Sequence, residues 1–274
     1  MRVAGWNLLR TTEPPLDAAA GRVVQGIRRL GKRLVFELEG GPVLALHLMI
    51  SGRLHWRAAG AAMPKRTGLA AFDFAAGTLL LTEASTKQRA ALHLFADPAA
   101  LEALDAGGLE PLTMSTEALA EVLSKATHTL KRALTDPRLF AGVGNAYSDE
   151  ILHRARLSPF KLTSQLDEAE RARLHTAIVG VLTEWRDRLL AEQGDAFPEK
   201  VTAFRPGMAV HGRFRNPCPD CGAPVQRVVN AENEMNYGAR CQTAGRLLAD
   251  RALSRLLHDD WPRTLEELEE RKRG

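Results

Sequence analysis

The chain has 274 residues, of which 45% are hydrophobic and 26% charged, a composition that excludes disorder, collagen and coiled coil and predicts one or two globular domains. No apolar run approaches the roughly 18 residues of a membrane span, and the N-terminus has no hydrophobic stretch typical of secretion. Three cysteines are too few for a disulfide framework. We therefore expect a soluble protein of a reducing cytoplasm. Its net charge of +4 permits a polyanionic partner without requiring one.

The first part of the chain has the pattern of antiparallel strands. Short runs rich in β-forming residues are separated by Gly and Pro turns, which predicts a sandwich of two antiparallel sheets. The runs are VVQGIRRL (23–30), RLVFELEG (33–40), PVLALHLMISGRLHW (42–56) and GTLLLTEA (77–84).

From Asp97 the periodicity becomes helical. Ser115 or Thr116 is a plausible N-cap for EALAEVLSKA, and a helix from about Leu130 should stop near Pro137. A long amphipathic helix is predicted from about 167 to 193. After a turn-rich cysteine segment, RLLADRALSRLL predicts a last helix from Gly245, before an acidic tail without an assigned role.

A glycine-rich turn, AGVGN, lies between two predicted helices. Gly142 and Gly144 allow close approach of the backbone to a ligand, and the N-terminus of the following helix offers free N–H groups to a phosphate. Lys131, one helix earlier, can add a positive charge at the same place. The alternative is an ordinary tight turn between two helices.

All three cysteines lie close together in the sequence. Cys218 and Cys221 form CPDC, and Cys241 ends GARC after a spacer typical of a zinc ribbon, but Gly238 stands where a fourth thiolate is needed. The spacing predicts a three-thiolate site that takes one further ligand, or no metal at all. His211 is the nearest spare donor, although a histidine at such a distance is more often unligated.

Two stretches make the sequence similar to a known family. LKRALTDPRLFAGVGNAYSDEILHRARLSP resembles the helix–two-turns–helix signature of formamidopyrimidine-DNA glycosylase and endonuclease VIII, and CPDCGAPVQRVV with NYGARCQT resembles the family's zinc finger. RRLGKRLVFELEGGPVLALHLMISGRL is similar to strands of its β-sandwich. The resemblance covers most of the chain from Val23 to Thr243.

The resemblance implies a base-excision-repair enzyme that flips a damaged base out of duplex DNA and cleaves its glycosidic bond. Lys131, Asn145 and the Gly142 and Gly144 backbone would hold the phosphates beside the lesion. Ile50, with Met49 beside it, would be the apolar wedge that fills the gap left by the flipped base, the alternative being core packing at a strand end. The remaining basic positions implied to contact DNA are Lys65, Arg66, Lys87 and Arg89.

The sequence departs from the family at three places. Family members begin Met-Pro-Glu and use the proline amine as nucleophile, whereas this chain begins Met-Arg-Val-Ala. The arginine of the family's finger aligns with Asn233, and one zinc ligand aligns with Gly238.

Three interpretations of the missing Pro-Glu pair stay open. In the first, the gene has an earlier start codon, and the longer protein has the Pro-Glu pair. In the second, the protein is a catalytically silent binder of damaged DNA. In the third, another amine forms the Schiff base, and Met1 and Lys65 are the candidates. A protein of another class, a zinc-ribbon adaptor that binds RNA or a partner protein, is the further alternative.

We therefore predict an α+β protein, an antiparallel β-sandwich followed by a helix–two-turns–helix domain with a degenerate zinc-finger hairpin. The function expected is that of a DNA glycosylase and AP lyase on damaged or abasic duplex DNA, in a monomer without membrane contact, cytoplasmic and associated with a bacterial nucleoid, with zinc as the possible cofactor. The predicted domains are 1–98, 112–206, 207–244 and 245–274.

Overall fold

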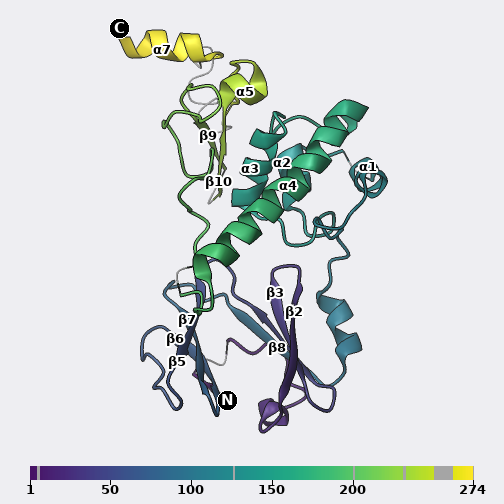
Figure 1. Cartoon of the computed structure of the whole chain (residues 1–274), viewed down its shortest axis with the longest axis vertical. Coiled ribbons are helices and arrows are strands. Elements are labelled where there is room, and N and C mark those ends of the chain that lie inside the picture. The colour runs from purple at the N-terminus through teal and green to yellow at the C-terminus, as the bar shows by residue number, and fades with distance from the viewer. Residues whose placement is uncertain (5–6, 126, 200, 231–232, 250–261, 274) are drawn as a thin grey trace. The chain divides into compact units, whose positions relative to one another are not determined.

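The computed structural model describes residues 1–274 except 5–6, 126, 200, 231–232, 250–261 and 274. The chain divides into two compact units (Figure 1). The first unit comprises Met1–Ala106 and Leu190–Val201, and the second comprises Gly107–Leu189 and Thr202–Gly274. Among the described residues, no helix is long and apolar enough to cross a membrane.

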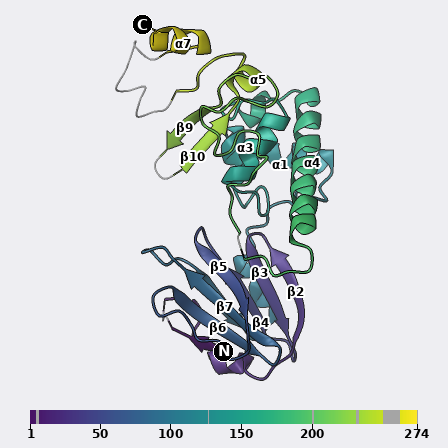
Figure 2. The same ribbon diagram turned by 60° about the vertical axis from the view of Figure 1, so that its left-hand side comes forward.

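The first unit contains two four-stranded antiparallel sheets, which form two layers (Figures 1 and 2). One sheet has the strand order β1-β6-β7-β5 and the other β2-β3-β4-β8. The predicted antiparallel sandwich is thereby confirmed. The strands are β1 (Arg2–Val3), β2 (Val24–Leu30), β3 (Arg33–Leu38), β4 (Val43–His47), β5 (Gly52–Arg57), β6 (Gly68–Phe74), β7 (Gly77–Glu83) and β8 (Ala91–Phe95), with the 3-10 helices η1 (Leu16–Ala19) and η2 (Pro98–Leu104).

The core of this unit explains why some strands are apolar throughout. Leu44 and Leu46 of β4 face the other sheet and pack in one cluster with Leu81 of β7. Val43 and Ala45, on the opposite face of β4, pack in a second cluster that includes Leu101 of η2. Because β4 is buried on both faces, its sequence is a continuous apolar run without alternation.

Strand register brings three loops to one end of the sandwich. Gly52 at the start of β5 pairs with Glu83 at the end of β7, and Gly68 at the start of β6 pairs with Thr82. In the other sheet, His47 at the end of β4 pairs with the first residue of β8. The three loops that meet there are the β4–β5 turn (48–51), the last part of the β5–β6 loop (61–67) and the β7–β8 loop (84–90).

The second unit consists of helices and one small hairpin. Ser115 caps the first helix as predicted, since its hydroxyl oxygen accepts from the Ala118 amide. Helix α2 ends before Pro137, and the long amphipathic helix was predicted within one residue of its observed start. The elements are α1 (Thr116–Ser124), α2 (Leu130–Thr135), α3 (Asn145–Arg154), η3 (Thr163–Gln165), α4 (Glu168–Gln193), β9 (Gln226–Asn230), β10 (Asn233–Tyr237), α5 (Ala239–Thr243) and α7 (Leu265–Arg273).

The core of the second unit is formed mainly by α1 to α4. Leu134 of α2, Ile151 of α3 and Ile178 of α4 are fully buried in one cluster. The hairpin has its own small cluster, which includes Met235 and Tyr237. The helix predicted from Gly245 falls for the most part on residues 250–261, outside the described residues. Its beginning was predicted wrongly, since residues 246–249 are not helical and Arg246 forms a β-bridge with Thr264. The acidic tail forms α7.

Candidate nucleic-acid interface and metal centre

The AGVGN turn leads directly into α3. Gly142 has a φ of +84°, a conformation that favours glycine, and Gly144 is the N-cap of the helix. The first helical hydrogen bond runs from the Ser148 amide to the Gly144 carbonyl at 3.0 Å. The three preceding amides, those of residues 145–147, therefore point out of the helix end, where its dipole is positive. This geometry is suited to an anion such as a phosphate.

Lys131 of α2 lies beneath this turn. Its side chain is 13% exposed, and its ammonium donates to the Asn145 carbonyl at 2.8 Å, to the Ser148 hydroxyl at 2.8 Å and to the Asp149 carboxylate. Burial lowers the pKa of Lys131, and the Asp149 charge opposes that effect. Since all three ammonium hydrogens are donated within the protein, direct contact with a phosphate requires Lys131 to give up one of these partners.

Two buried carboxylates of α3 connect the turn to the rest of the unit. The other oxygen of Asp149 lies 2.8 Å from Nδ1 of His211 and accepts from the Asn236 amide of β10 at 3.1 Å. The Glu150 carboxylate accepts from the amides of residues 209, 210 and 211 at 2.7 to 2.9 Å. Neither residue was among those predicted from the sequence; the available signal was an acidic pair inside a helix, followed directly by the apolar residues Ile151 and Leu152.

The β4–β5 turn exposes the two residues predicted to form a wedge. Met49 is 42% exposed and Ile50 79% exposed. Met49 also has a φ of +53°, which is uncommon for a residue other than glycine, and its amide donates to Nδ1 of His47 at 3.0 Å. The alternative that both residues pack in the core is therefore wrong. Their insertion into DNA stays a prediction.

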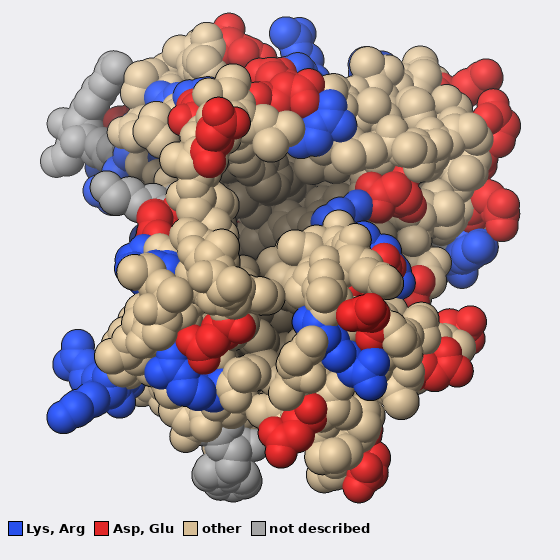
Figure 3. Space-filling model, turned by 60° about the horizontal axis from the view of Figure 1, so that its bottom comes forward, with Lys and Arg blue, Asp and Glu red and all other residues tan. Residues whose placement is uncertain are grey.

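The four basic candidates lie on the two loops beside this turn. Lys65 and Arg66 belong to loop 61–67, Lys87 and Arg89 belong to loop 84–90, and all four are exposed. Buried Glu83 supports the β7–β8 loop, since one of its oxygens accepts from the amides of Arg89 and Ala90 at 2.9 Å each. Basic and acidic side chains are intermixed on the face shown in Figure 3. Charge alone therefore does not mark the interface.

The two candidate amines lie in different parts of the sandwich. Lys65 belongs to the loop that ends at Gly68 and is exposed. Met1 precedes Arg2, which pairs with Ala71 and forms an ion pair with Asp73 at 2.7 Å. The strand register thus places Met1 toward Phe72, in the second half of β6 and away from the three loops.

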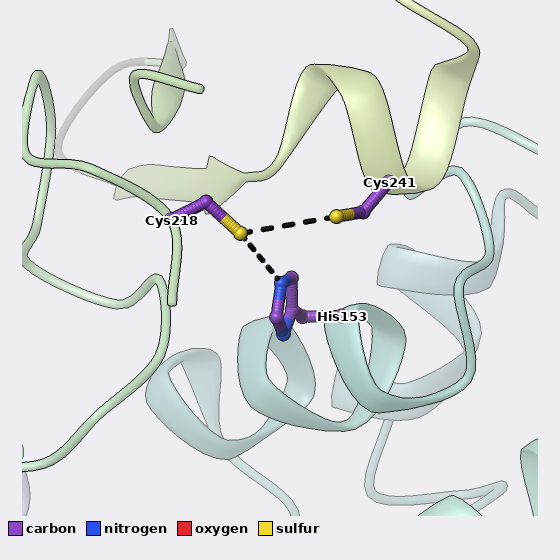
Figure 4. Close-up of side chains that lie close together, drawn as sticks. All are labelled: His153, Cys218 and Cys241. Carbon is purple, nitrogen blue, oxygen red and sulfur yellow. Dashed lines mark hydrogen bonds between the residues drawn. The ribbon is translucent and has the colours of Figure 1, made fainter. Parts of the chain in front are cut away.

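A cluster of metal-ligating side chains joins the cysteine segment to α3 (Figure 4). The Sγ atoms of Cys218 and Cys241 are 3.8 Å apart, and Nε2 of His153 lies 3.2 Å from Sγ of Cys218. The ligand atoms of these three residues lie within 4.8 Å of one another. The arrangement can hold a metal ion. His153 was not among the residues expected here.

The thiol of Cys221 interacts with those of Cys218 and Cys241. Although burial opposes the change, the Ala223 amide and the two neighbouring thiols lower the pKa of Cys221. Burial, together with the same neighbours, raises the pKa of Cys241 to about 12. Three thiols so close together cannot all ionise without a compensating cation.

Two buried histidines, His153 and His211, lie near the cysteine segment and have different neighbours. His211, the nearest spare donor in the sequence, is buried; its Nδ1 lies 2.8 Å from Asp149 and its ring stacks on Phe204 with ring centroids 5.3 Å apart, and the cluster of ligand atoms among the described residues does not include it. His153 instead faces the thiols, and burial lowers its pKa, which keeps the imidazole neutral as a metal ligand requires.

Two family models match the chain. Residues 4–91 match the formamidopyrimidine-DNA glycosylase N-terminal domain, and residues 108–185 match the formamidopyrimidine-DNA glycosylase H2TH domain. A β-sandwich followed by a helix–two-turns–helix unit defines a class of DNA-repair glycosylases.

Similar proteins agree with these models. The formamidopyrimidine-DNA glycosylase of Thermus thermophilus is 36% identical over 83% of this chain and 85% of its own, and that of Heliobacterium modesticaldum is 34% identical over 82% and 84%. The Lactococcus lactis Fpg in complex with an abasic site containing DNA has a TM-score of 0.70 at 27% identity, covering 81% of this chain and 83% of the other. The chain belongs to the formamidopyrimidine-DNA glycosylase family.

Proposed function

We propose that this protein binds duplex DNA containing a damaged base or an abasic site and acts on it as a DNA glycosylase and AP lyase. The observation that carries the proposal is the α3 N-terminus. The turn with Gly142 and Gly144 leads into this helix, and three backbone N–H groups are free at the positive end of the helix dipole. A solved relative, the MutM of TM-score 0.71, is in complex with carbocyclic 8-oxo-G containing DNA, which supports a substrate with an oxidised purine.

Each contact would have a distinct task. The α3 amides and Asn145 would bind the phosphates beside the lesion, with the Lys131 charge directly behind them. The exposed Ile50 and Met49 would fill the space left by the extruded base. Phosphate contacts give salt-dependent affinity, whereas the wedge favours a site where the base stack is already broken.

For the lyase step we propose Lys65 as the amine, with Met1 as the second candidate. A neutral amine attacks C1′ of the abasic sugar aldehyde, and loss of water from the carbinolamine gives a Schiff base. Borohydride reduces this C=N bond to a stable secondary amine. Lys65 is favoured because its loop ends beside the turn that carries Ile50.

Borohydride trapping on a duplex with one abasic site tests the chemistry. We expect an adduct with the unmodified protein, no adduct with Lys65→Ala, and an unchanged adduct with the control variant Lys125→Ala, which alters an exposed lysine at the end of α1. Trapping that persists in Lys65→Ala and maps to Met1 assigns the step to the second candidate. Binding without any adduct identifies a silent binder of damaged DNA and contradicts the lyase proposal.

We also propose that zinc is the bound metal, held by the thiolates of Cys218, Cys221 and Cys241. Three sulfur donors in two short segments suit a structural zinc site. Such a zinc would stabilise the hairpin formed by β9 and β10, since in small ribbons metal binding and folding are coupled.

A further inference from the structure

The position of the fourth zinc ligand is filled by glycine in this chain. Gly238 precedes α5 with a φ of −88°, so its backbone conformation is one that any residue adopts. A Cβ atom on Gly238 would lie 3.6 Å from Sγ of Cys218 and 3.3 and 3.5 Å from Cδ2 and Nε2 of His153. A side chain at residue 238 would thus point toward the thiols and meet His153 there.

The distance from Nε2 of His153 to the Cys218 sulfur is close to that of two ligands of one zinc ion. In a tetrahedral zinc site with ordinary bond lengths, two sulfurs are about 3.8 Å apart, and a nitrogen and a sulfur about 3.5 Å apart. The separation of the Cys218 and Cys241 sulfurs is 3.8 Å, and that of Nε2 and the Cys218 sulfur is 3.2 Å. His153 is 4% exposed, so its ring is packed inside the unit, with Nε2 beside the Cys218 thiol.

We infer that His153 of α3 replaces the missing cysteine as the fourth ligand, which makes the centre a Cys3His site formed by Cys218, Cys221, Cys241 and His153. This inference rests on the proposed zinc site but not on any glycosylase activity. The glycine at 238 leaves the room that the imidazole needs.

The placement of His153 gives the centre a second role. Asn145, Asp149 and His153 follow one another at intervals of four and therefore lie on one face of α3. The side-chain Nδ2 of Asn145 donates to the Glu234 carbonyl at 2.7 Å, and Asp149 accepts from the β10 backbone. Zinc on His153 would add the third link between this helix face and the cysteine hairpin. Metal binding would thereby hold the helix whose first turn carries the proposed phosphate site.

One neighbouring group provides a matched control. The Asp220 carboxylate lies 4.0 Å from Nε2 of His153 and is 42% exposed at its side chain. As an oxygen donor inside the CPDC segment, it is the competing candidate for the fourth position. Asp220→Asn should leave zinc binding unchanged if His153 is the ligand.

X-ray absorption at the zinc edge of the full-length protein identifies the ligands directly. We expect one zinc per chain with three sulfurs at about 2.3 Å, one nitrogen at about 2.0 Å and the outer-shell scattering of an imidazole. Affinity is measured in parallel by competition with a chromophoric chelator. His153→Ala should bind zinc at least about 100-fold more weakly, because one of the four side chains that bind the metal directly is lost. Asp220→Asn should retain both the spectrum and the affinity.

The double variant His153→Ala, Gly238→Cys keeps the test decisive. It also lacks the imidazole but gains a thiol where the histidine was, so it should regain tight binding with four sulfurs. Zinc bound without imidazole scattering, or bound by His153→Ala as tightly as by the unmodified protein, overturns the assignment of His153 and leaves the thiolate site standing. Absence of stoichiometric zinc from the unmodified protein overturns both proposals.

Discussion

Glu150 is predicted to be a main support of the second unit. Glu150 is 5% exposed, and its carboxylate accepts from three consecutive amides, with Oε2 bound to Ala209 and Oε1 to Val210 and His211. In Glu150→Gln, the amide oxygen can serve Val210 and His211, but the NH2 group then faces the Ala209 N–H, donor against donor. One charge-assisted bond is lost, two are weakened, and a backbone amide is left without its acceptor.

The size of the effect follows from these bonds. A hydrogen bond to a charged group contributes about 1.5–3 kcal/mol, and an unsatisfied buried amide costs about 1–3 kcal/mol. Because the two oxygen-bound amides keep most of their interaction, we expect the free energy of unfolding to fall by about 2–4 kcal/mol. For a unit of about 150 residues, at about 2–4 °C for each kcal/mol, this lowers the Tm by about 4–16 °C. Glu150→Ala loses all three acceptors and should lower it further.

Differential scanning calorimetry of the full chain checks the prediction, with Glu184→Gln as the control. Glu184 pairs with Arg154 at 2.9 Å, but both side chains are more than half exposed, so its loss should shift the Tm by less than about 2 °C. A Tm of Glu150→Gln equal to that of the control would refute the reasoning that this carboxylate holds residues 209–211.

Four further predictions follow from the structure. Gly142→Ala forces a Cβ into a φ of +84° and should lower stability by about 1 kcal/mol and weaken DNA binding, measured by calorimetry and anisotropy; unchanged binding would separate the turn from the DNA. Lys131→Met leaves the buried Asp149 charge without its cation and should cost about 3–5 kcal/mol in denaturant unfolding, whereas a neutral effect would mean that the pair is dispensable. Ile50→Ala should weaken binding to an abasic duplex with no change in Tm, and an equal loss on intact duplex would argue against a wedge. Hydrogen bonds from Arg57 and, to a smaller extent, from His55 lower the pKa of Glu199 to about 2. The stabilisation that the ionised Glu199 gives is therefore present above pH 4.5 and is lost as the pH falls toward 2. The free energy of unfolding of Glu199→Gln should fall less steeply over that range in acid titration, and a pH profile identical to that of the unmodified protein would contradict this role of Glu199.

The fold could be predicted well from the sequence because its elements have strong local signals. Glycine and proline turns separate the strands, and Ser115 and Pro137 mark helix ends through the chemistry of capping and of the proline ring. The apolar run of β4 was recognisable as a strand, but the second packing partner, Leu101 of η2, comes from a separate segment. The four domain bounds given from the sequence stay a prediction.

The candidate site was less accessible to sequence reasoning. Gly142, Asn145 and the cysteines are marked by local spacing, whereas His153 and Cys218 are 65 positions apart and meet only through the packing of α3 on the hairpin. No rule of sequence spacing predicts that a helix residue will contact a cysteine segment so far along the chain. The same holds for Asp149, whose partners come from α2, residue 211 and β10. The exposure of Ile50 required the turn geometry, since an apolar residue at a strand end fits a core equally well.

The most direct test of the account is the affinity for damaged DNA at several salt concentrations. Fluorescence anisotropy compares a duplex carrying one abasic site, the same duplex intact and a single-stranded RNA, all with the full chain. The account predicts tightest binding to the abasic duplex, with the logarithm of the affinity falling linearly with that of the salt concentration at a slope of about −0.9 for each phosphate contacted. Equal affinity for the abasic and intact duplexes, or a preference for the RNA, would contradict it.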